Sequence, residues 1–337
     1  MKKDAPRRLI VRAPNWVGDV VMATPVLEAA VRDPRFERVS IAIRAHLAPL
    51  LRPGPCAERV VELDGSSEPA RLRALDADAI LLLTSSLGAA WRAFRAGIGI
   101  RAGLAIHGRG PLLTHRLRRP PKGSPPLATA LVHQRAAALL GIEVPDLHPR
   151  LFFDEADAAA SRALLAERGI AAGERYAVAC PGAAFGAAKL WPPERFAAAL
   201  DALFERHGLR GVVTGGPGEE ELCAAVAAAS KTGVLSLADA KVDLHGLKPL
   251  IANAAILLVG DSGPRWYAAA FDVPCVSVMG PNDPRLTATS LERCTVVRIE
   301  DLECSPCMER ICPLGHHKCM VDLPVARVVA AAEALLA

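Results

Sequence analysis

Short runs of β-branched and aliphatic residues alternate along the chain with longer stretches rich in alanine and leucine. The short runs have the length of buried strands and the longer stretches that of helices. This alternation is typical of parallel sheets covered by helices and predicts an α/β fold. The expected strands are residues 8–12, 38–43, 79–83, 176–180, 210–214, 256–259 and 273–279, and the clearest helices are 124–141, 157–168, 193–206 and 218–229.

With 337 residues the chain is long enough for two domains. Between residues 141 and 150 the periodic pattern gives way to a proline-bounded segment, which predicts a junction between domains 1–150 and 151–337. No apolar run approaches the roughly 18 residues of a membrane span, and no signal-peptide core follows the basic start. A cytoplasmic protein is therefore expected.

Charge is distributed unevenly between the two predicted domains. Residues 1–150 contain 23 Lys/Arg and 13 Asp/Glu, a net +10, whereas residues 151–337 contain 17 and 23, a net −6. The first domain is thus suited to an anionic partner. Its densest basic run, near Arg109, fits either a solvated loop or an anion site; it comprises Arg116, Arg118, Arg119 and Lys122. Nucleic acid is not an expected partner, because aromatic residues make up 4% of the chain and no basic helix or aromatic ladder is visible.

A single carboxylate, Asp19, follows the first predicted strand and its Pro/Asn/Gly turn. Open α/β sheets place their chemistry at the carboxyl ends of strands. Asp19 also precedes an apolar stretch that begins at Val20, where an N-cap aspartate would stand. A catalytic carboxylate and a helix cap both fit this position. The neighbouring Trp16, like Trp191, is predicted to be a packing residue.

Three glycine-containing loops of the second domain each lead from a predicted strand to a helix. The first ends at Lys189, whose charge suits a phosphate, and the second contains Glu219, whose carboxylate suits ribose hydroxyls. The third offers backbone amides at a helix start, next to Asp261, Ser262 and Gly263. Asp261 itself fits either a sugar contact or a helix cap. A single glycine-rich turn between a strand and a helix is common and usually only structural. Three such turns on consecutive βα units predict a site for a nucleotide diphosphate.

Four of the nine cysteines cluster within residues 304–319. The cluster consists of Cys304, Cys307, Cys312 and Cys319, with His316 and His317 between the last two. These side chains are ligands for zinc or an iron–sulfur cluster, although the spacing fits a standard zinc knuckle poorly. A metal site, a metal-free thiol-rich loop and a disulfide pair all remain open, with the disulfide disfavoured in a reducing compartment.

Short motifs occur in order along nearly the whole chain: Asn15-x-x-Gly18-Asp19, Arg101-x-Gly103, Gly108-Arg109-Gly110, Pro181-Gly182, Lys189-x-Trp191-Pro192, Gly215-Gly216-Pro217, Asp261-Ser262-Gly263, Gly280-Pro281-x-Asp283-Pro284 and the tail ending in Cys319-Met320. The series resembles the lipopolysaccharide heptosyltransferases of glycosyltransferase family 9, and among them the heptosyltransferase II group. These enzymes transfer heptose from ADP-heptose.

The resemblance implies a GT-B architecture, in which two Rossmann-like lobes with parallel sheets face a central cleft. It places the acceptor in the lobe 1–150 and the nucleotide-sugar donor in the lobe 151–337. Asp19 then matches the general base of an inverting transfer. Lys189, Ser262 and Gly263 match groups that stabilise the departing diphosphate without a metal or other cofactor; Glu219 and Asp261 are further donor-binding candidates.

The implied acceptor is the lipid A–inner core portion of lipopolysaccharide, reached at the periphery of the inner membrane. Its anionic groups suit the basic lobe, where the acceptor-binding candidates are Asn15, Arg109, Arg116, Arg118, Arg119 and Lys122. One position departs from the family pattern, because Trp266 stands where a histidine is usual, and tryptophan offers only a ring and one N–H donor.

Three alternatives stay open beside this interpretation. The chain fits another family 9 transferase of the heptosyltransferase I type, or a nucleotide-sugar epimerase of GT-B fold. It also fits a metal-containing anion-binding protein without enzymatic activity.

Overall fold

A computed structural model describes residues 7–121 and 123–337. The chain divides into two compact units: unit 1 runs up to Phe152 and includes Arg285–Thr289, and unit 2 consists of Phe153–Pro284 and Ser290–Ala337. No helix within the described ranges is long and apolar enough to cross a membrane.

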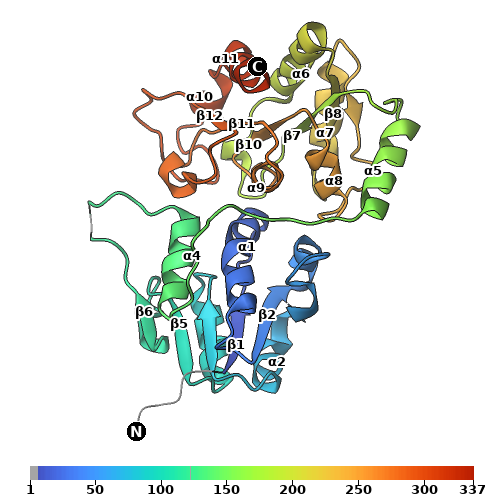
Figure 1. The fold of residues 1–337 in the computed structure, drawn as a ribbon. Coiled ribbons are helices and arrows are strands. Elements are labelled where there is room, and N and C mark those ends of the chain that lie inside the picture. Colours follow the sequence, from blue (N-terminus) through green and yellow to red (C-terminus); the bar gives the residue numbers. More distant parts are fainter. Residues whose placement is uncertain (1–6, 122) are drawn as a thin grey trace. The chain divides into compact units, whose positions relative to one another are not determined.

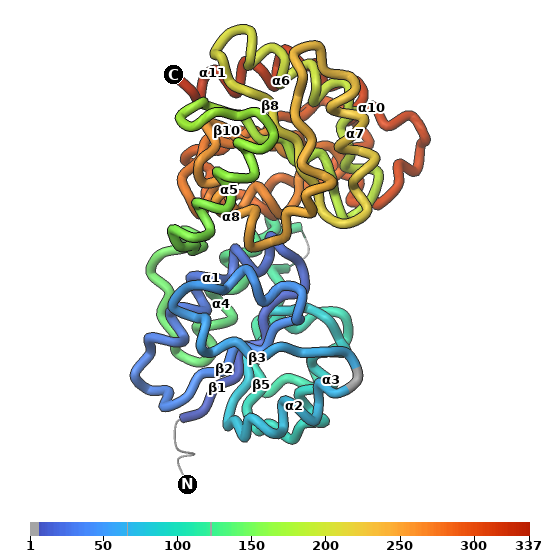
Figure 2. The backbone as a smooth tube through the Cα atoms, turned by 90° about the vertical axis from the view of Figure 1, so that its right-hand side faces the viewer, coloured from blue at the N-terminus to red at the C-terminus, as the bar shows by residue number. Residues whose placement is uncertain are grey.

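Unit 1 is a parallel six-stranded sheet in the order β3-β2-β1-β4-β5-β6. Helices α1 and α4 pack together on one face, and α2 and α3 pack on the other (Figures 1 and 2). The elements are β1 (Arg8–Arg12), α1 (Val17–Arg32), β2 (Arg38–Arg44), β3 (Val60–Leu63), α2 (Glu68–Ala74), β4 (Ala79–Leu82), α3 (Leu87–Arg95), β5 (Ile100–Leu104), β6 (His115–Leu117) and α4 (Thr129–Ala138).

Unit 2 contains a second parallel six-stranded sheet, in the order β12-β11-β10-β7-β8-β9. Its core includes Trp191 and Phe196, whose rings pack edge to face with their centroids 5.0 Å apart. The elements are α5 (Glu155–Glu167), β7 (Tyr176–Cys180), α6 (Pro193–His207), β8 (Arg210–Val213), α7 (Glu220–Ala229), β9 (Leu235–Ser236), α8 (Leu247–Ala252), β10 (Ile256–Gly260), α9 (Arg265–Ala270), β11 (Cys275–Val278), β12 (Cys294–Val297), α10 (Lys318–Val321) and α11 (Val325–Leu336).

The strand order creates one switch point in each sheet. In unit 1 the chain builds outward from β1 to β3, then crosses to β4 on the other side of β1. In unit 2 it builds outward from β7 to β9 and then crosses to β10. Loops diverge at such a point and leave a crevice at the carboxyl ends of the strands. Each unit therefore has one favoured place for a ligand.

The predicted α/β class with two parallel sheets is confirmed. The predicted strands are present, with ends shifted by up to two residues, because they are buried on both faces and need continuous apolar runs. Several elements were not predicted: the strands β3, β5, β6, β9 and β12 and the helices α2, α3, α8, α10 and α11. Most of them are short or partly exposed, so their apolar pattern is weaker.

Candidate active site

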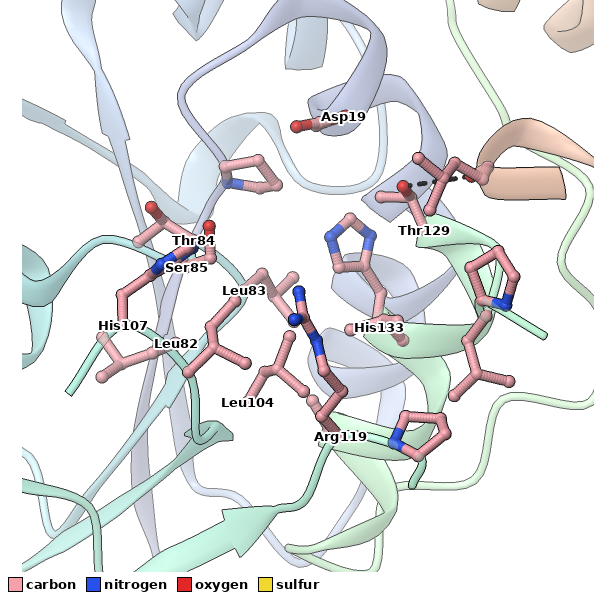
Figure 3. Close-up of a pocket in the computed structure, with 18 of the residues that line it drawn as sticks. Asp19, Leu82, Leu83, Thr84, Ser85, Leu104, His107, Arg119, Thr129 and His133 are labelled. Atoms are coloured by element: carbon pink, nitrogen blue, oxygen red, sulfur yellow. Dashed lines mark hydrogen bonds between the residues drawn. The ribbon is translucent and has the colours of Figure 1, made fainter. Parts of the chain in front are cut away.

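A cavity of about 640 Å³ lies within unit 1 at the carboxyl ends of β1, β4 and β5 (Figure 3). Loops after these strands, the start of α4 and Leu286 line it. Its walls combine apolar side chains such as Leu83 and Leu104 with polar ones such as Thr84 and Ser85. An apolar lining with a few converging polar groups is the usual character of a small-molecule site.

Asp19 lines this cavity from the first turn of α1. Helix α1 begins at Val17 and its N-cap is Trp16, so Asp19 is the third helical residue and the N-cap alternative is wrong. Trp16 also lines the cavity with 48% of its surface exposed, so the prediction of a packing role is wrong for Trp16. It holds for Trp191, which is fully buried.

Asn15 lies within a chain of hydrogen bonds that runs from Glu68 to Thr84. Glu68 accepts from Arg12 Nε at 2.9 Å, and Arg12 donates to the side-chain oxygen of Asn15 at 3.1 Å. The Asn15 amide nitrogen in turn donates to Thr84 at 3.2 Å. These bonds fix the orientation of Asn15 and join the loops after β1 and β4. Asn15 therefore presents a fixed amide at the cavity wall.

The basic candidates of unit 1 occupy different environments. Arg109 is fully buried and donates to the main-chain oxygens of Leu104 and Thr84, so it holds two cavity loops together rather than facing an exposed ligand. Arg119 lines the cavity, and Figure 3 shows its guanidinium directed into it. Arg116 and Arg118 are exposed and lie outside the cavity lining. Lys122 lies outside the described residues.

His133, on α4, is a cavity residue that the sequence did not single out. Its side chain is 3% exposed, and burial lowers its pKa to about 4, so the imidazole is neutral near pH 7. Its Nδ1 has no hydrogen-bond partner among the described residues. Figure 3 shows the ring directed from α4 toward the cavity. An unpaired buried nitrogen is costly, which favours a ligand or water as its partner.

In unit 2 the corresponding switch point is occupied by a buried ion pair. Lys189, from the loop after β7, donates to the Asp261 carboxylate at 2.6 Å and to its main-chain oxygen at 3.0 Å. Asn282, after β11, donates to the same carboxylate at 2.6 Å. Asp261 caps no helix, because α9 starts at Arg265 with Pro264 as N-cap. The three residues tie together loops that follow three neighbouring strands.

An aromatic ring lies between two cations beside this ion pair. The Lys189 ammonium is 4.7 Å from the centroid of the Phe185 ring, and the Arg310 guanidinium is 5.2 Å from the same centroid. Cation–π attraction holds both charges close to one ring. The positive charge of Arg310, which belongs to a different loop, is therefore held close to that of Lys189.

Glu219 lies directly against the loop after β7. A Cβ at Gly182 would lie 2.0 Å from its carboxyl carbon, so only glycine leaves room for this carboxylate. The carboxylate accepts from the Gly216 amide at 2.8 Å, and burial raises its pKa. An acidic group at this place can accept from sugar hydroxyls, as in dinucleotide-binding folds.

The third predicted loop offers one amide fewer than expected. The Ser262 amide already donates to the Gly260 oxygen at 2.8 Å, and Gly263 accepts from Trp266 at its carbonyl. Trp266 is 4% exposed, with the Arg265 guanidinium 4.8 Å from its ring centroid. It is therefore a packed residue whose ring carries a cation.

The cysteine cluster does not form a metal centre in the described part of the chain, where no three His, Cys, Asp or Glu side chains are arranged to hold an ion. Cys319 is buried, which together with the nearby cysteines raises its pKa to about 11. Cys312 instead accepts from the His317 amide at 3.3 Å, and main-chain N–H groups lower its pKa. The zinc or iron–sulfur hypothesis gains no support from this geometry.

Three site residues were missed by sequence reasoning: His133, Asn282 and Arg310. Asn282 is the x of the motif Gly280-Pro281-x-Asp283, so its position inside this motif could have identified it as a candidate. His133 had none, because a single histidine in an alanine-rich helix has no distinguishing pattern.

The family model for glycosyltransferase family 9 (heptosyltransferase) matches residues 69–318. This is most of the chain, and the protein belongs to this family. The loops after β7, β8 and β10 all fall within the matched region.

Individual relatives and a solved structure agree with this assignment. A lipooligosaccharide heptosyltransferase 2 of Haemophilus influenzae is 26% identical over 94% of this chain and 95% of its own length. One of Campylobacter jejuni is 34% identical, but the alignment spans only about half of each protein, 46% of this chain and 49% of the relative. The structure of Escherichia coli ADP-heptose LPS heptosyltransferase II matches with a TM-score of 0.78 and 24% identity over 98% of both chains. The fold is thus that of the GT-B heptosyltransferases.

Proposed function

We propose that this protein is an inverting glycosyltransferase that moves heptose from ADP-heptose to the inner core of lipopolysaccharide. The observation that carries the proposal is that the carboxylate of Asp19 lines a ligand-sized cavity at the switch point of unit 1. The second unit has a separate charged site, the Lys189–Asp261 pair, at its own switch point. A transferase needs two such sites, one for each substrate. Unit 1 binds the acceptor and unit 2 the donor.

The donor site is built by the loops after β7, β8 and β10. Lys189, with Arg310 close by, supplies positive charge for the diphosphate, and Glu219 accepts from the ribose hydroxyls. Lys189 is already paired with Asp261, so a diphosphate shares or takes over this cation on binding. The leaving group gains negative charge as the glycosidic bond breaks, so the lysine stabilises the transition state more than the ground state.

The chemical step requires removal of a proton from the attacking acceptor hydroxyl. Asp19 accepts this proton while the hydroxyl oxygen attacks the anomeric carbon and ADP departs from the opposite face. The anomeric configuration is therefore inverted. Asn15, Arg119 and His133 surround the same cavity and orient the acceptor. No cofactor is needed for this step.

The relatives support the choice of substrates, since their names specify lipooligosaccharide or lipopolysaccharide heptosyltransferase 2. The acceptor is then a lipid A–inner core molecule anchored in the inner membrane. The enzyme works at that membrane as a peripheral protein. The expected place of action is the cytoplasmic side, where nucleotide sugars are made.

Two measurements test the proposal. In thermal melting with ADP, UDP, GDP and CMP at about a hundredfold excess over Kd, ADP should stabilise the protein by about 2.7 kcal/mol. In a transfer assay, ADP-heptose and a lipid A–inner core acceptor that already carries its first heptose should yield ADP and the glycosylated acceptor. Stabilisation by UDP but not ADP would overturn the donor assignment.

The same assay separates the alternatives. An epimerase would interconvert the nucleotide sugar without any acceptor. A heptosyltransferase of type I would accept the inner core lacking all heptose, whereas one of type II needs the first heptose in place. An anion-binding protein without activity would bind both substrates and release no ADP.

A further inference from the structure

Helix α3 of unit 1 exposes three large apolar side chains in one stripe. Leu87, Trp91 and Phe94 are 50%, 48% and 47% exposed, and they are spaced by four and three residues, which places them on one side of the helix. The rings of Trp91 and Phe94 stack with centroids 5.7 Å apart. Exposed apolar side chains that form a contiguous group mark an interaction surface more often than isolated ones do.

The packing of α3 is the reverse of that in an ordinary surface helix. Its buried positions are the small residues Ala89, Ala90 and Ala93, which pack on the sheet of unit 1. The large apolar residues point outward instead. A helix stabilised only by its own unit would bury the large side chains, because they gain more from leaving water. This distribution indicates a second apolar environment outside the unit.

The chain segment that contains this stripe is basic, although Arg92 Nε also lies 3.7 Å from the buried Glu68 carboxylate of α2. Residues 79–142 contain nine Lys/Arg and no Asp or Glu. Arg92 and Arg95 lie on α3 itself, and the Arg101 guanidinium is 5.5 Å from the centroid of the Phe94 ring. Exposed aromatic rings among arginines are typical of a helix that lies in the headgroup region of an anionic bilayer.

We propose that α3 is the membrane-docking element of this enzyme, with Leu87, Trp91 and Phe94 inserted among the headgroups of anionic lipids and the arginines bound to their phosphates. The inference rests on the proposed function, because it supplies the reason for contact with a lipid surface. The N-cap of α3 is Ser86, which with Ser85 also lines the cavity. The docking stripe thus begins one residue from the wall of the proposed acceptor site.

A second copy of the chain is a poorer occupant of this surface. A two-fold contact brings the same residues of both copies together, so Arg92 and Arg95 of one copy would approach those of the other. Such like charges repel when they are desolvated. A bilayer rich in acidic lipids provides both the apolar layer and the opposite charge.

The test measures binding of the whole protein to vesicles of phosphatidylethanolamine with 30% phosphatidylglycerol and to vesicles of phosphatidylcholine alone. The parent should bind the anionic vesicles, lose binding as NaCl rises from 50 to 500 mM, and show a blue shift of tryptophan emission. The double variant Trp91→Ser/Phe94→Ser should bind at least about tenfold more weakly. The matched control is Leu291→Ser, an apolar residue of unit 2 with 41% exposure, which should bind as the parent does.

Equal binding by the parent and the double variant, at unchanged melting temperature, would overturn the proposal. So would a parent dimer in sedimentation that the double substitution dissociates, since a second copy would then cover the stripe. Transfer to a deacylated, water-soluble acceptor separates the two ideas. The double variant should keep the parent rate with this acceptor and lose rate only with acceptor in vesicles. If no variant or parent transfers heptose while the vesicle results stand, the proposed function fails and the docking surface remains.

Discussion

Replacing Asp19 with asparagine separates a catalytic carboxylate from a structural one. The substitution keeps the shape of the side chain and removes its ability to accept a proton. If Asp19 is the general base, the rate of the chemical step should fall by about 10² to 10⁴. That range corresponds to about 2.7 to 5.5 kcal/mol in the activation free energy.

The helix-dipole contribution of the Asp19 charge to stability is much smaller than this. Asp19 lies in the first turn of α1, where a negative charge interacts favourably with the helix dipole. Loss of that charge costs about 0.3 to 1 kcal/mol. Asp19 is not the N-cap, so no capping hydrogen bond is lost. The helix-dipole effect alone therefore changes the melting temperature by a few degrees.

The assay is single-turnover transfer from ADP-heptose, measured together with ADP affinity and thermal melting. Glu155→Gln is the matched control, because Glu155 is an exposed carboxylate in the first turn of α5, and removal of its charge reports the helix-dipole effect together with the loss of its exposed ion pair to Arg162. The control should transfer heptose at the parent rate. An Asp19→Asn variant within tenfold of that rate would refute the assignment of Asp19 as base.

Three further changes probe the donor loops and the cavity. Lys189→Ala should weaken ADP-heptose binding at least tenfold, and it should destabilise the fold by about 3 to 5 kcal/mol because the buried Asp261 carboxylate loses its partner. Adding Asp261→Asn should restore the melting temperature but not the affinity for ADP-heptose. Recovery of both would show that Lys189 has no contact with the donor. Gly182→Ala should displace the Glu219 carboxylate and lower the affinity for ADP, measured by calorimetry, whereas pyrophosphate should bind as before. Equal losses of affinity for ADP and pyrophosphate would place Glu219 away from the ribose. Because the pKa of His133 is about 4 in the fold and 6.5 in the unfolded chain, the unfolded state binds more protons between these values, so stability should fall from pH 6.5 to pH 4 by up to about 3 kcal/mol. Urea titrations of His133→Gln across this range should show a correspondingly flatter dependence, and an unchanged slope would mean that His133 is not the group responsible.

The sequence by itself determined the class of fold and the loops in which the candidate site residues lie. Strands such as β1 and β7 are buried on both faces, so their apolar runs are continuous and are visible without any structure. The loops that follow them carry Asp19 and Lys189 for the same reason, since the carboxyl ends of parallel strands are where polar residues can leave the core. The motif series identified the family, which the family model then matched over residues 69–318.

Only the tertiary structure decided which of these residues meet. Lys189 and Asp261 are 72 positions apart, and they pair because the chain crosses from β9 back to β10, next to β7. The same crossing in unit 1 gathers Asn15, Thr84 and His133 around one cavity. The order of strands in a sheet depends on long-range packing, which the local spacing of residues does not encode. The outward stripe of α3 has the same origin, because the alanines pack inward only when the sheet beneath them is in place.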